Sequence, residues 1–335
     1  MLSSNTRTGL ITLLLALLSS ISLAAPASQS FDARSWLDRM SHAFKEQNYR
    51  GVLIYGGNQR WETLQITHGV MDGVEYERLL HLTGEPREVI RKGHDITCIH
   101  PGEHVIRLSN HQNPLSHRVG KGVEGFVHQT SDIDAYYQLQ LADGERIAGR
   151  DTQQVLVSPT DKYRYGYKLW LDSDTGLLLR SDLVDAQGRA LERFQFADVE
   201  IGNAIPAADF EPQSEGHRVA AHLAKDEMKE VKHRQNWQLG WLPRGFMAAA
   251  SQVENLEKGK GALATLMYTD GLAAITLFID DVDGETNMPA MSQQWGVTAA
   301  VVRYLETDGG DYRITVVGEV PLMTVEKIAA SVMSQ

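Results

Sequence analysis

The chain of 335 residues lacks several features that would assign it to a common class of protein. It has one cysteine, Cys98, so no intramolecular disulfide can form. Basic residues are outnumbered, with 32 Lys and Arg against 43 Asp and Glu, and the formal net charge of -11 argues against non-specific binding to nucleic acid phosphates. After the first residues, no apolar run approaches the roughly 20 residues of a membrane-spanning helix. These absences exclude a disulfide scaffold and favour a folded chain with specific partners.

Catalytic signatures are also missing, because neither G-x-S-x-G nor H-E-x-x-H occurs. The string "GKGVEG" at 120–125 fits a dinucleotide loop by letter, but it follows a His- and Pro-rich stretch rather than a strand. Cys98, His100 and His104 could be taken for metal ligands, yet their spacing matches no closed zinc site. Cys98 is then expected to be a small buried side chain. We predict no enzyme activity, no cofactor and no metal site.

The amino terminus has the pattern of a secretory signal. Residues 1–9 carry Arg7 and no acid, residues 10–18 are apolar, and "SISLAA" supplies the small residues that a signal peptidase requires. We predict a signal peptide over residues 1–24, with cleavage after Ala24. An uncleaved N-terminal anchor is the alternative interpretation, and no cysteine follows the small residues as a lipoprotein would require.

The pattern after residue 25 predicts two domains. The stretch "SFDARSWLDRMSHAFKEQNYRG" predicts one amphipathic helix that ends at Gly51, and short β-rich stretches then run to about residue 212, apart from "SDIDAYYQLQLADG", which suggests a helix and a turn. Residues 213–235 are polar and carry both charge signs, which is typical of a linker, part of it helical. A second apolar pattern starts at Trp237 and ends with a helix from Pro321, which predicts a smaller α+β domain.

The stretch 161–196 alternates apolar and polar side chains, which predicts a three-stranded meander with one apolar face. Arg164, Lys168, Trp170 and Asp172 are expected on the other face. An apolar face of this kind can be a packed core or can line a cavity for an apolar ligand, and periodicity leaves both open. The candidate lipid-binding residues on that face are Tyr165, Tyr167, Leu169, Leu177 and Leu179.

Longer strings show a resemblance to a known family. They are "YRGVLIYGG", "ERLLHLTGEPREVIRKG", "WLPRGF", "ITVVGEVPLMTVEKIA" and the meander itself, and they occur in order along nearly the whole mature chain. In these strings the sequence resembles the MucB/RseB family of periplasmic regulators of an envelope-stress sigma factor. The resemblance implies an α+β chain with a LolA/LolB-like, incompletely closed antiparallel β-barrel with helices over residues 25–212. A linker over residues 213–235 and a C-terminal α+β partner-binding domain over residues 236–335 would follow.

The resemblance also implies a function. Such a protein would bind the periplasmic segment of a MucA- or RseA-type anti-sigma factor, protect it from site-1 proteolysis, and release it when lipid, lipopolysaccharide or lipoprotein acyl chains bind. A periplasmic lipid or lipoprotein carrier of LolA type is the main alternative, although a carrier needs only the larger domain, and a hydrolase is a third. The oligomeric state stays open, with a homodimer as one option.

Overall fold

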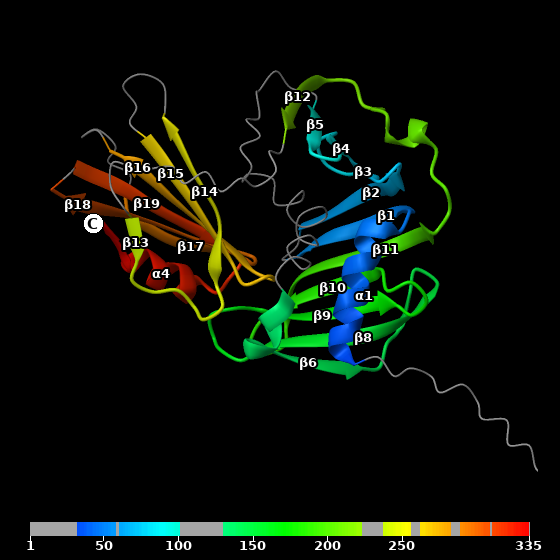
Figure 1. Ribbon diagram of the computed structural model, residues 1–335, viewed down its shortest axis with the longest axis horizontal. Helices are drawn as coiled ribbons and strands as arrows, with labels where there is room; N and C mark the ends of the chain where they lie inside the picture. Colours follow the sequence, from blue (N-terminus) through cyan, green and yellow to red (C-terminus); the bar gives the residue numbers. More distant parts are fainter. Residues whose placement is uncertain are drawn as a thin grey trace, which may run out of the picture. The chain divides into compact units, whose positions relative to one another are not determined.

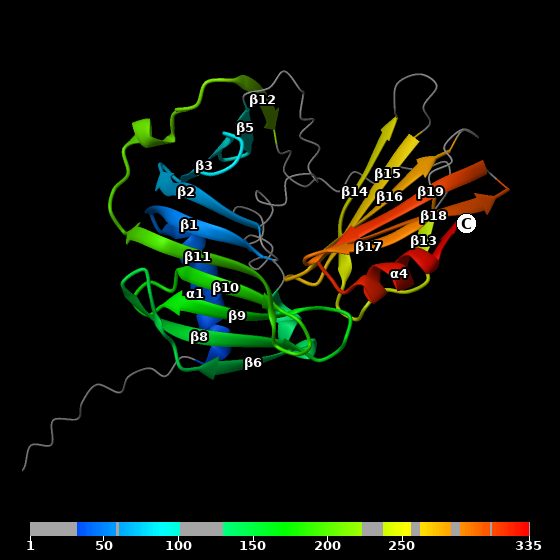
Figure 2. The same cartoon turned by 180° about the vertical axis from the view of Figure 1, so that it is seen from behind.

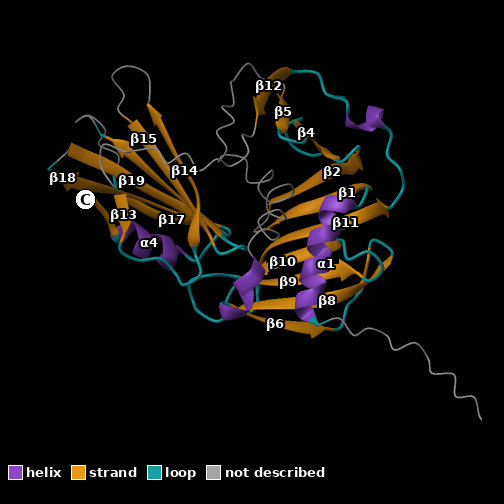
Figure 3. Cartoon of the chain, viewed as in Figure 1, coloured by secondary structure: helices purple, strands orange, loops and turns teal. Residues whose placement is uncertain are grey.

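The structure is a computed structural model that describes residues 32–57, 60–100, 130–222, 237–255, 262–282, 289–308 and 310–334. The predicted signal peptide, the string at 120–125 and His104 lie outside these residues. The described part is built mainly from antiparallel strands with few helices, which form a larger and a smaller sheet (Figures 1 and 3). Figure 2 gives the opposite view.

The larger sheet has twelve strands in the order β12-β5-β4-β3-β2-β1-β11-β10-β9-β8-β6, with β7 paired to β8. Strands β12 and β6 end this path, and no pairing within the described ranges joins them, so the sheet does not close. The predicted incompletely closed antiparallel sheet is confirmed. The strands are β1 (Tyr49–Gly57), β2 (Arg60–Met71), β3 (Val74–His81), β4 (Glu88–Lys92), β5 (Asp95–His100), β6 (Tyr137–Ala142), β7 (Arg146–Ile147), β8 (Arg150–Pro159), β9 (Gly166–Asp172), β10 (Leu178–Val184), β11 (Ala190–Ile201) and β12 (His217–His222).

Helix α1 (Ala33–Glu46) covers one face of this sheet (Figure 1). Its start is fixed by Asp32, whose carboxylate accepts a hydrogen bond from the amide of Ser35 at 2.7 Å, as an N-cap does. The helix was predicted to end at Gly51, and this is wrong, because the chain is already extended at Gln47. Gly51 lies inside β1, where a Cβ would stand 2.2 Å from the carbonyl oxygen of Asp198 on β11. The glycine therefore permits close approach of two strands.

One further prediction of helix is corrected, and a second is tested only in part. The stretch from Thr130 forms the 3-10 helix η2 (Thr130–Ala135) and then enters strand β6. Within the polar stretch 213–235, the described residues end with strand β12, which pairs with β5, and residues 223–235 lie outside the described residues. The chain before β12 contains the 3-10 helix η3 (Ala207–Phe210) and is held by Glu88, whose carboxylate accepts the amide of Ser214 at 2.6 Å.

The smaller sheet has six strands in the order β14-β15-β16-β19-β18-β17, and β13 and β20 pair separately. Helix α4 (Leu322–Ala330) follows Pro321, as predicted, and buries Val325 and Ile328. The smaller α+β domain is therefore confirmed as a separate sheet. Its strands are β13 (Trp237–Leu239), β14 (Met247–Asn255), β15 (Ala262–Thr269), β16 (Ala274–Asp281), β17 (Met291–Trp295), β18 (Thr298–Thr307), β19 (Gly310–Gly318) and β20 (Val332–Ser334).

Candidate functional site

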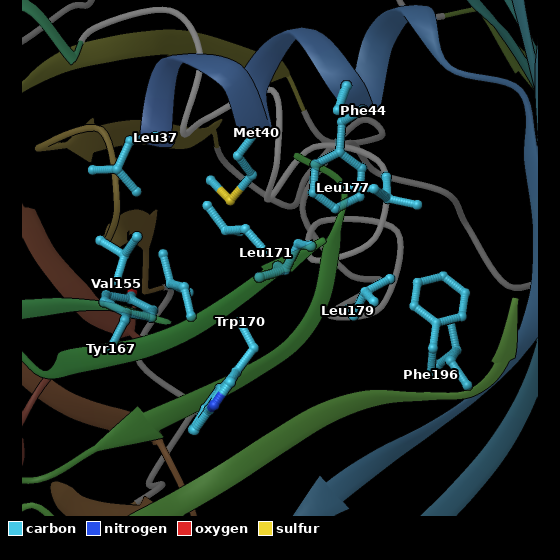
Figure 4. Close-up of a cluster of buried hydrophobic side chains, with 14 of the residues drawn as sticks. Leu37, Met40, Phe44, Val155, Tyr167, Trp170, Leu171, Leu177, Leu179 and Phe196 are labelled. Atoms are coloured by element: carbon cyan, nitrogen blue, oxygen red, sulfur yellow. The ribbon is translucent and has the colours of Figure 1, made fainter. Parts of the chain in front are cut away.

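The apolar face of the meander lies beneath α1. Leu169, Leu177 and Leu179 are fully buried, with 0% of each exposed, and belong to one hydrophobic core with the helix. In Figure 4 the side chains of Leu37, Met40 and Phe44 point from the helix toward this face, whereas Trp170 points away from it. The ring of Trp170 packs instead under the guanidinium of its cross-strand neighbour Arg180, 4.0 Å away. Within β9 (Gly166–Asp172) the predicted faces are therefore as observed, and in this conformation the helix covers the apolar one. The side chains that α1 buries are Ala33, Trp36, Leu37, Met40, Ala43 and Phe44.

The other two candidate residues, Tyr165 and Tyr167, are buried where the larger domain meets the smaller one. The Tyr165 hydroxyl accepts a hydrogen bond from the side-chain amide of Gln294 at 2.6 Å. The Tyr167 hydroxyl donates to the carbonyl oxygen of Leu272 at 3.1 Å. Burial raises the pKa of Tyr165, so its hydroxyl keeps its proton. The five candidates thus divide into leucines under α1 and tyrosines that contact the smaller domain.

A buried ion pair lies next to these tyrosines. Arg164 donates from Nη1 to Oδ2 of Asp270 at 2.6 Å, and neither side chain has any exposed surface. The hydroxyl of Tyr137 donates to the same carboxylate oxygen at 2.9 Å. Burial, and then the negative charge of Asp270, raise the pKa of Tyr137 well above its ordinary value. A buried charge pair of this kind requires accurate geometry and further hydrogen bonds, which the surrounding groups supply.

Those surrounding groups come from both domains. Arg164 also donates to Asp161 at 3.0 Å and to the carbonyl oxygen of Arg244 at 2.6 Å. The rings of Tyr136, Tyr137 and Phe246 lie 5.2–5.5 Å from its guanidinium carbon, within cation–π range. We call this contact the joint: the turn at 160–165 and the residue pair 136–137 of the larger domain, with residues 244–246 and 270–273 of the smaller one.

Sequence reasoning missed the joint. It placed Arg164 on the polar face of a strand, but β9 begins only at Gly166 and Arg164 lies in the preceding turn. Its partner Asp270 is in the short turn between β15 and β16, where an Asp usually caps its own backbone. Asp270 also caps its own turn, because its Oδ1 accepts hydrogen bonds from the backbone amides of Leu272 and Ala273 at 3.0 and 2.8 Å. Nothing in the local sequence indicates that its second oxygen faces another domain.

A second polar network lies in strands β2 to β4 and holds Glu75. Its carboxylate lies 3.3 Å from Nε2 of His68 and 2.9 Å from Nη1 of Arg91. Burial alone would raise the pKa of Glu75, but the hydrogen bonds from His68 and Arg91 outweigh it and lower the pKa to about 2. Tyr49 stacks on the His68 ring with centroids 4.7 Å apart. This network stabilises the sheet, and the Glu75 carboxylate is already bound to His68 and Arg91.

The described residues were searched for metal ligands and for a reactive thiol. Within the described ranges no group of three or more His, Cys, Asp or Glu is placed to hold a metal ion. His100 faces His217 across β5 and β12 with ring centroids 5.6 Å apart, and Cys98 is buried with its thiol pKa raised by that burial. Among the described segments, no helix is both long enough and apolar enough to cross a membrane.

The fold and the joint therefore define a class: a two-domain protein in which an open antiparallel sheet covered by a helix is held to a smaller α+β domain by buried polar contacts. The profile of the MucB/RseB N-terminal domain matches residues 32–214, and that of the MucB/RseB C-terminal domain matches residues 231–333. The chain belongs to the MucB/RseB family.

Individual relatives agree with this assignment. The chain is 37% identical over 324 residues to the sigma factor AlgU regulatory protein MucB of Pseudomonas aeruginosa, which covers 96% of each chain. It is 27% identical to the sigma-E factor regulatory protein RseB of Haemophilus influenzae over 94% of each chain. Among solved structures, the Pseudomonas aeruginosa MucA/MucB complex matches with a TM-score of 0.74 and 33% identity, covering 90% of this chain and 99% of the other.

Proposed function

We propose that this chain is a periplasmic regulator that binds the periplasmic segment of a MucA-type anti-sigma factor and so controls the activity of a sigma factor. The observation that carries the proposal is the match to MucB, which spans both domains and 96% of the chain, together with the similarity to MucB in complex with MucA(peri). In this proposal the bound segment is protected from the protease that makes the first cut.

The partner-binding test is a titration of the purified periplasmic segment against three fragments. These are residues 25–335, residues 25–222 and residues 237–335. The cut follows His222, because β12 is part of the larger sheet and a cut near Glu215 would remove it. We expect tight binding only by the two-domain chain. A lipid carrier would need the larger domain alone, so we attribute the smaller domain to partner binding. Full affinity in residues 25–222 would contradict this and favour the LolA-type carrier.

The proposed trigger for release is an acylated ligand. An acyl chain that entered the face beneath α1 would have to take the place of helix side chains such as Met40 and Phe44, because Leu169 and Leu177 are fully covered. Burial of the chain contributes about 0.8 kcal/mol per methylene, so binding should strengthen with chain length. A ligand can release the partner only by its preference for the partner-free state, and a 99:1 reversal needs about 5.5 kcal/mol of preference.

The lipid test uses Leu169→Glu and Leu177→Glu, with thermal stability, binding of a fluorescent palmitate analogue and partner binding measured on each. A folded variant that no longer binds the palmitate analogue but still binds and protects the anti-sigma segment supports a lipid site under α1. Collapse of stability would favour a filled core, because an unpaired buried charge is poorly tolerated. Unchanged palmitate affinity in a folded variant would place the lipid site elsewhere.

A further inference from the structure

One short stretch of chain contributes to both the apolar face and the joint. Residues 161–165 form the turn that holds Arg164 and Tyr165 against the smaller domain. The chain then continues directly into β9, whose Leu169 and Leu171 lie fully buried under α1. The core under α1 also extends into the smaller domain, because Val297 belongs to it and Leu272 packs against it. The two regions are therefore in direct contact.

Tyr167 belongs to both regions with a single side chain. The residue is 9% exposed, its side chain packs within the core under α1, and it lies opposite Val157 on β8 and Leu183 on β10. Its hydroxyl donates to the carbonyl oxygen of Leu272, in the turn whose first residue is Asp270. The ring and the hydroxyl of a tyrosine move as one rigid body, so a displacement of the ring must also move or break the bond to Leu272.

Arg164 and Asp270 supply a fixed point beside this bond. Separating them would leave the buried Asp270 carboxylate without its cationic partner and Arg164 with one carboxylate fewer, and that is a costly change. The bond of Tyr167 is between neutral groups and is worth far less. A disturbance of the apolar face should therefore loosen the Leu272 side of the turn while the ion pair stays closed.

We propose that Tyr167 is the positioning residue that couples the apolar face of the larger sheet to the smaller domain. Because the core is closely packed, a change in the groups packed against the apolar face displaces the Tyr167 ring. The displaced hydroxyl then weakens its hydrogen bond to Leu272 in the turn at 270–273. The inference rests on the proposed function only where it concerns release of a partner. The coupling itself is a property of the chain alone and can be tested without a ligand.

The test without ligand is a double-mutant cycle read by amide hydrogen exchange in residues 25–335. Leu169→Ala removes packing next to the Tyr167 ring, and Leu64→Ala removes an equally buried leucine on β2 as the control. The reporting amides are those of Gly271, Leu272 and Ala273, which donate to side chains of their own turn. We expect about five-fold faster exchange there in Leu169→Ala and less than two-fold in Leu64→Ala, given the net value of one neutral hydrogen bond.

Tyr167→Phe keeps the ring and removes the bond. Alone it should also speed exchange at residues 271–273 about five-fold, and adding Leu169→Ala should then have no further effect there. A purely structural tyrosine would instead give additive effects in the double variant. Additivity, or unchanged exchange in Leu169→Ala, overturns the proposal. Tyr165→Phe, which removes only the bond with Gln294, should leave the response to Leu169→Ala intact.

A second arm uses a palmitate analogue and the periplasmic anti-sigma segment. If palmitate weakens partner binding by the wild-type chain, Tyr167→Phe should reduce that weakening about five-fold, with each chain compared with its own partner affinity measured without lipid. Equal weakening in wild type and Tyr167→Phe overturns the coupling. Failure of palmitate to affect partner binding in the wild type contradicts lipid-triggered release, while the exchange cycle still decides the coupling.

Discussion

Removal of the Asp270 carboxylate should have a large effect on the stability of the two-domain chain. In Asp270→Ala the guanidinium of Arg164 stays buried with one of its charged partners gone, and the hydroxyl of Tyr137 loses its acceptor. Breaking a buried pair by removing one partner typically costs about 3–5 kcal/mol. The amides of Leu272 and Ala273 lose their acceptor as well. We expect a loss at the upper end of that range.

The assay is urea unfolding of residues 25–335, monitored by tryptophan fluorescence, because the ring of Trp241 lies 4.8 Å, centroid to centroid, from the ring of Tyr163 in the joint. The matched control is the double variant Arg164→Met and Asp270→Leu, which removes both charges and should recover the part of the loss that comes from the unpaired charge of Arg164. Asp270→Ala in the isolated fragment 237–335 should cost much less, since Arg164 is absent there. A loss in the full chain below about 1 kcal/mol, the value of an exposed pair, would refute the role given to the joint.

Two further predictions concern other residues. Glu75 has a pKa lowered from 4.5 to about 2, so its contribution to stability is complete above pH 4.5 and is lost as the pH falls toward 2. Glu75→Gln should therefore flatten the loss of thermal stability over that pH range, and an unchanged slope would contradict the interpretation. Gly245 has φ of +89°, and a Cβ there would stand 2.4 Å from the ring of Tyr136. Gly245→Ala should lower the melting temperature of the full chain, with Gly188→Ala as the control, because Gly188 also has positive φ but open space around it. Equal effects of the two substitutions would show that backbone strain, not contact with Tyr136, decides the cost.

The sequence was sufficient for features that depend on local periodicity. The faces of β9, the start of the C-terminal helix after Pro321 and the amphipathic α1 all follow from spacing that one element controls by itself. The end of α1 was mispredicted because Gly51 has a role set by β11, a strand far away in the chain. A glycine needed for close packing and a glycine that ends a helix look alike in sequence.

Features that depend on pairing between segments far apart in the chain could not be predicted from the sequence. Strand β12 looked like part of a polar linker because the stretch has almost no large apolar side chains, and its pairing with β5 is what makes it a strand. The joint was missed for a similar reason, since Arg164 and Asp270 each have an unremarkable local environment. The lipid-binding role of Tyr165, Tyr167, Leu169, Leu177 and Leu179 stays a prediction, although their burial is now described.

The pairing of β5 with β12 has a consequence for how the chain folds. Strand β5 is made early, but the strand that covers its outer edge, β12, comes only after β6 to β11. Until then the backbone amide and carbonyl groups along that edge have no other strand of the described residues beside them, and such an edge can pair with another chain. Contacts between segments so far apart in sequence also form slowly. The unfinished domain should therefore be most prone to aggregation late in folding, and a chaperone that masks an exposed strand would help this protein most at that stage.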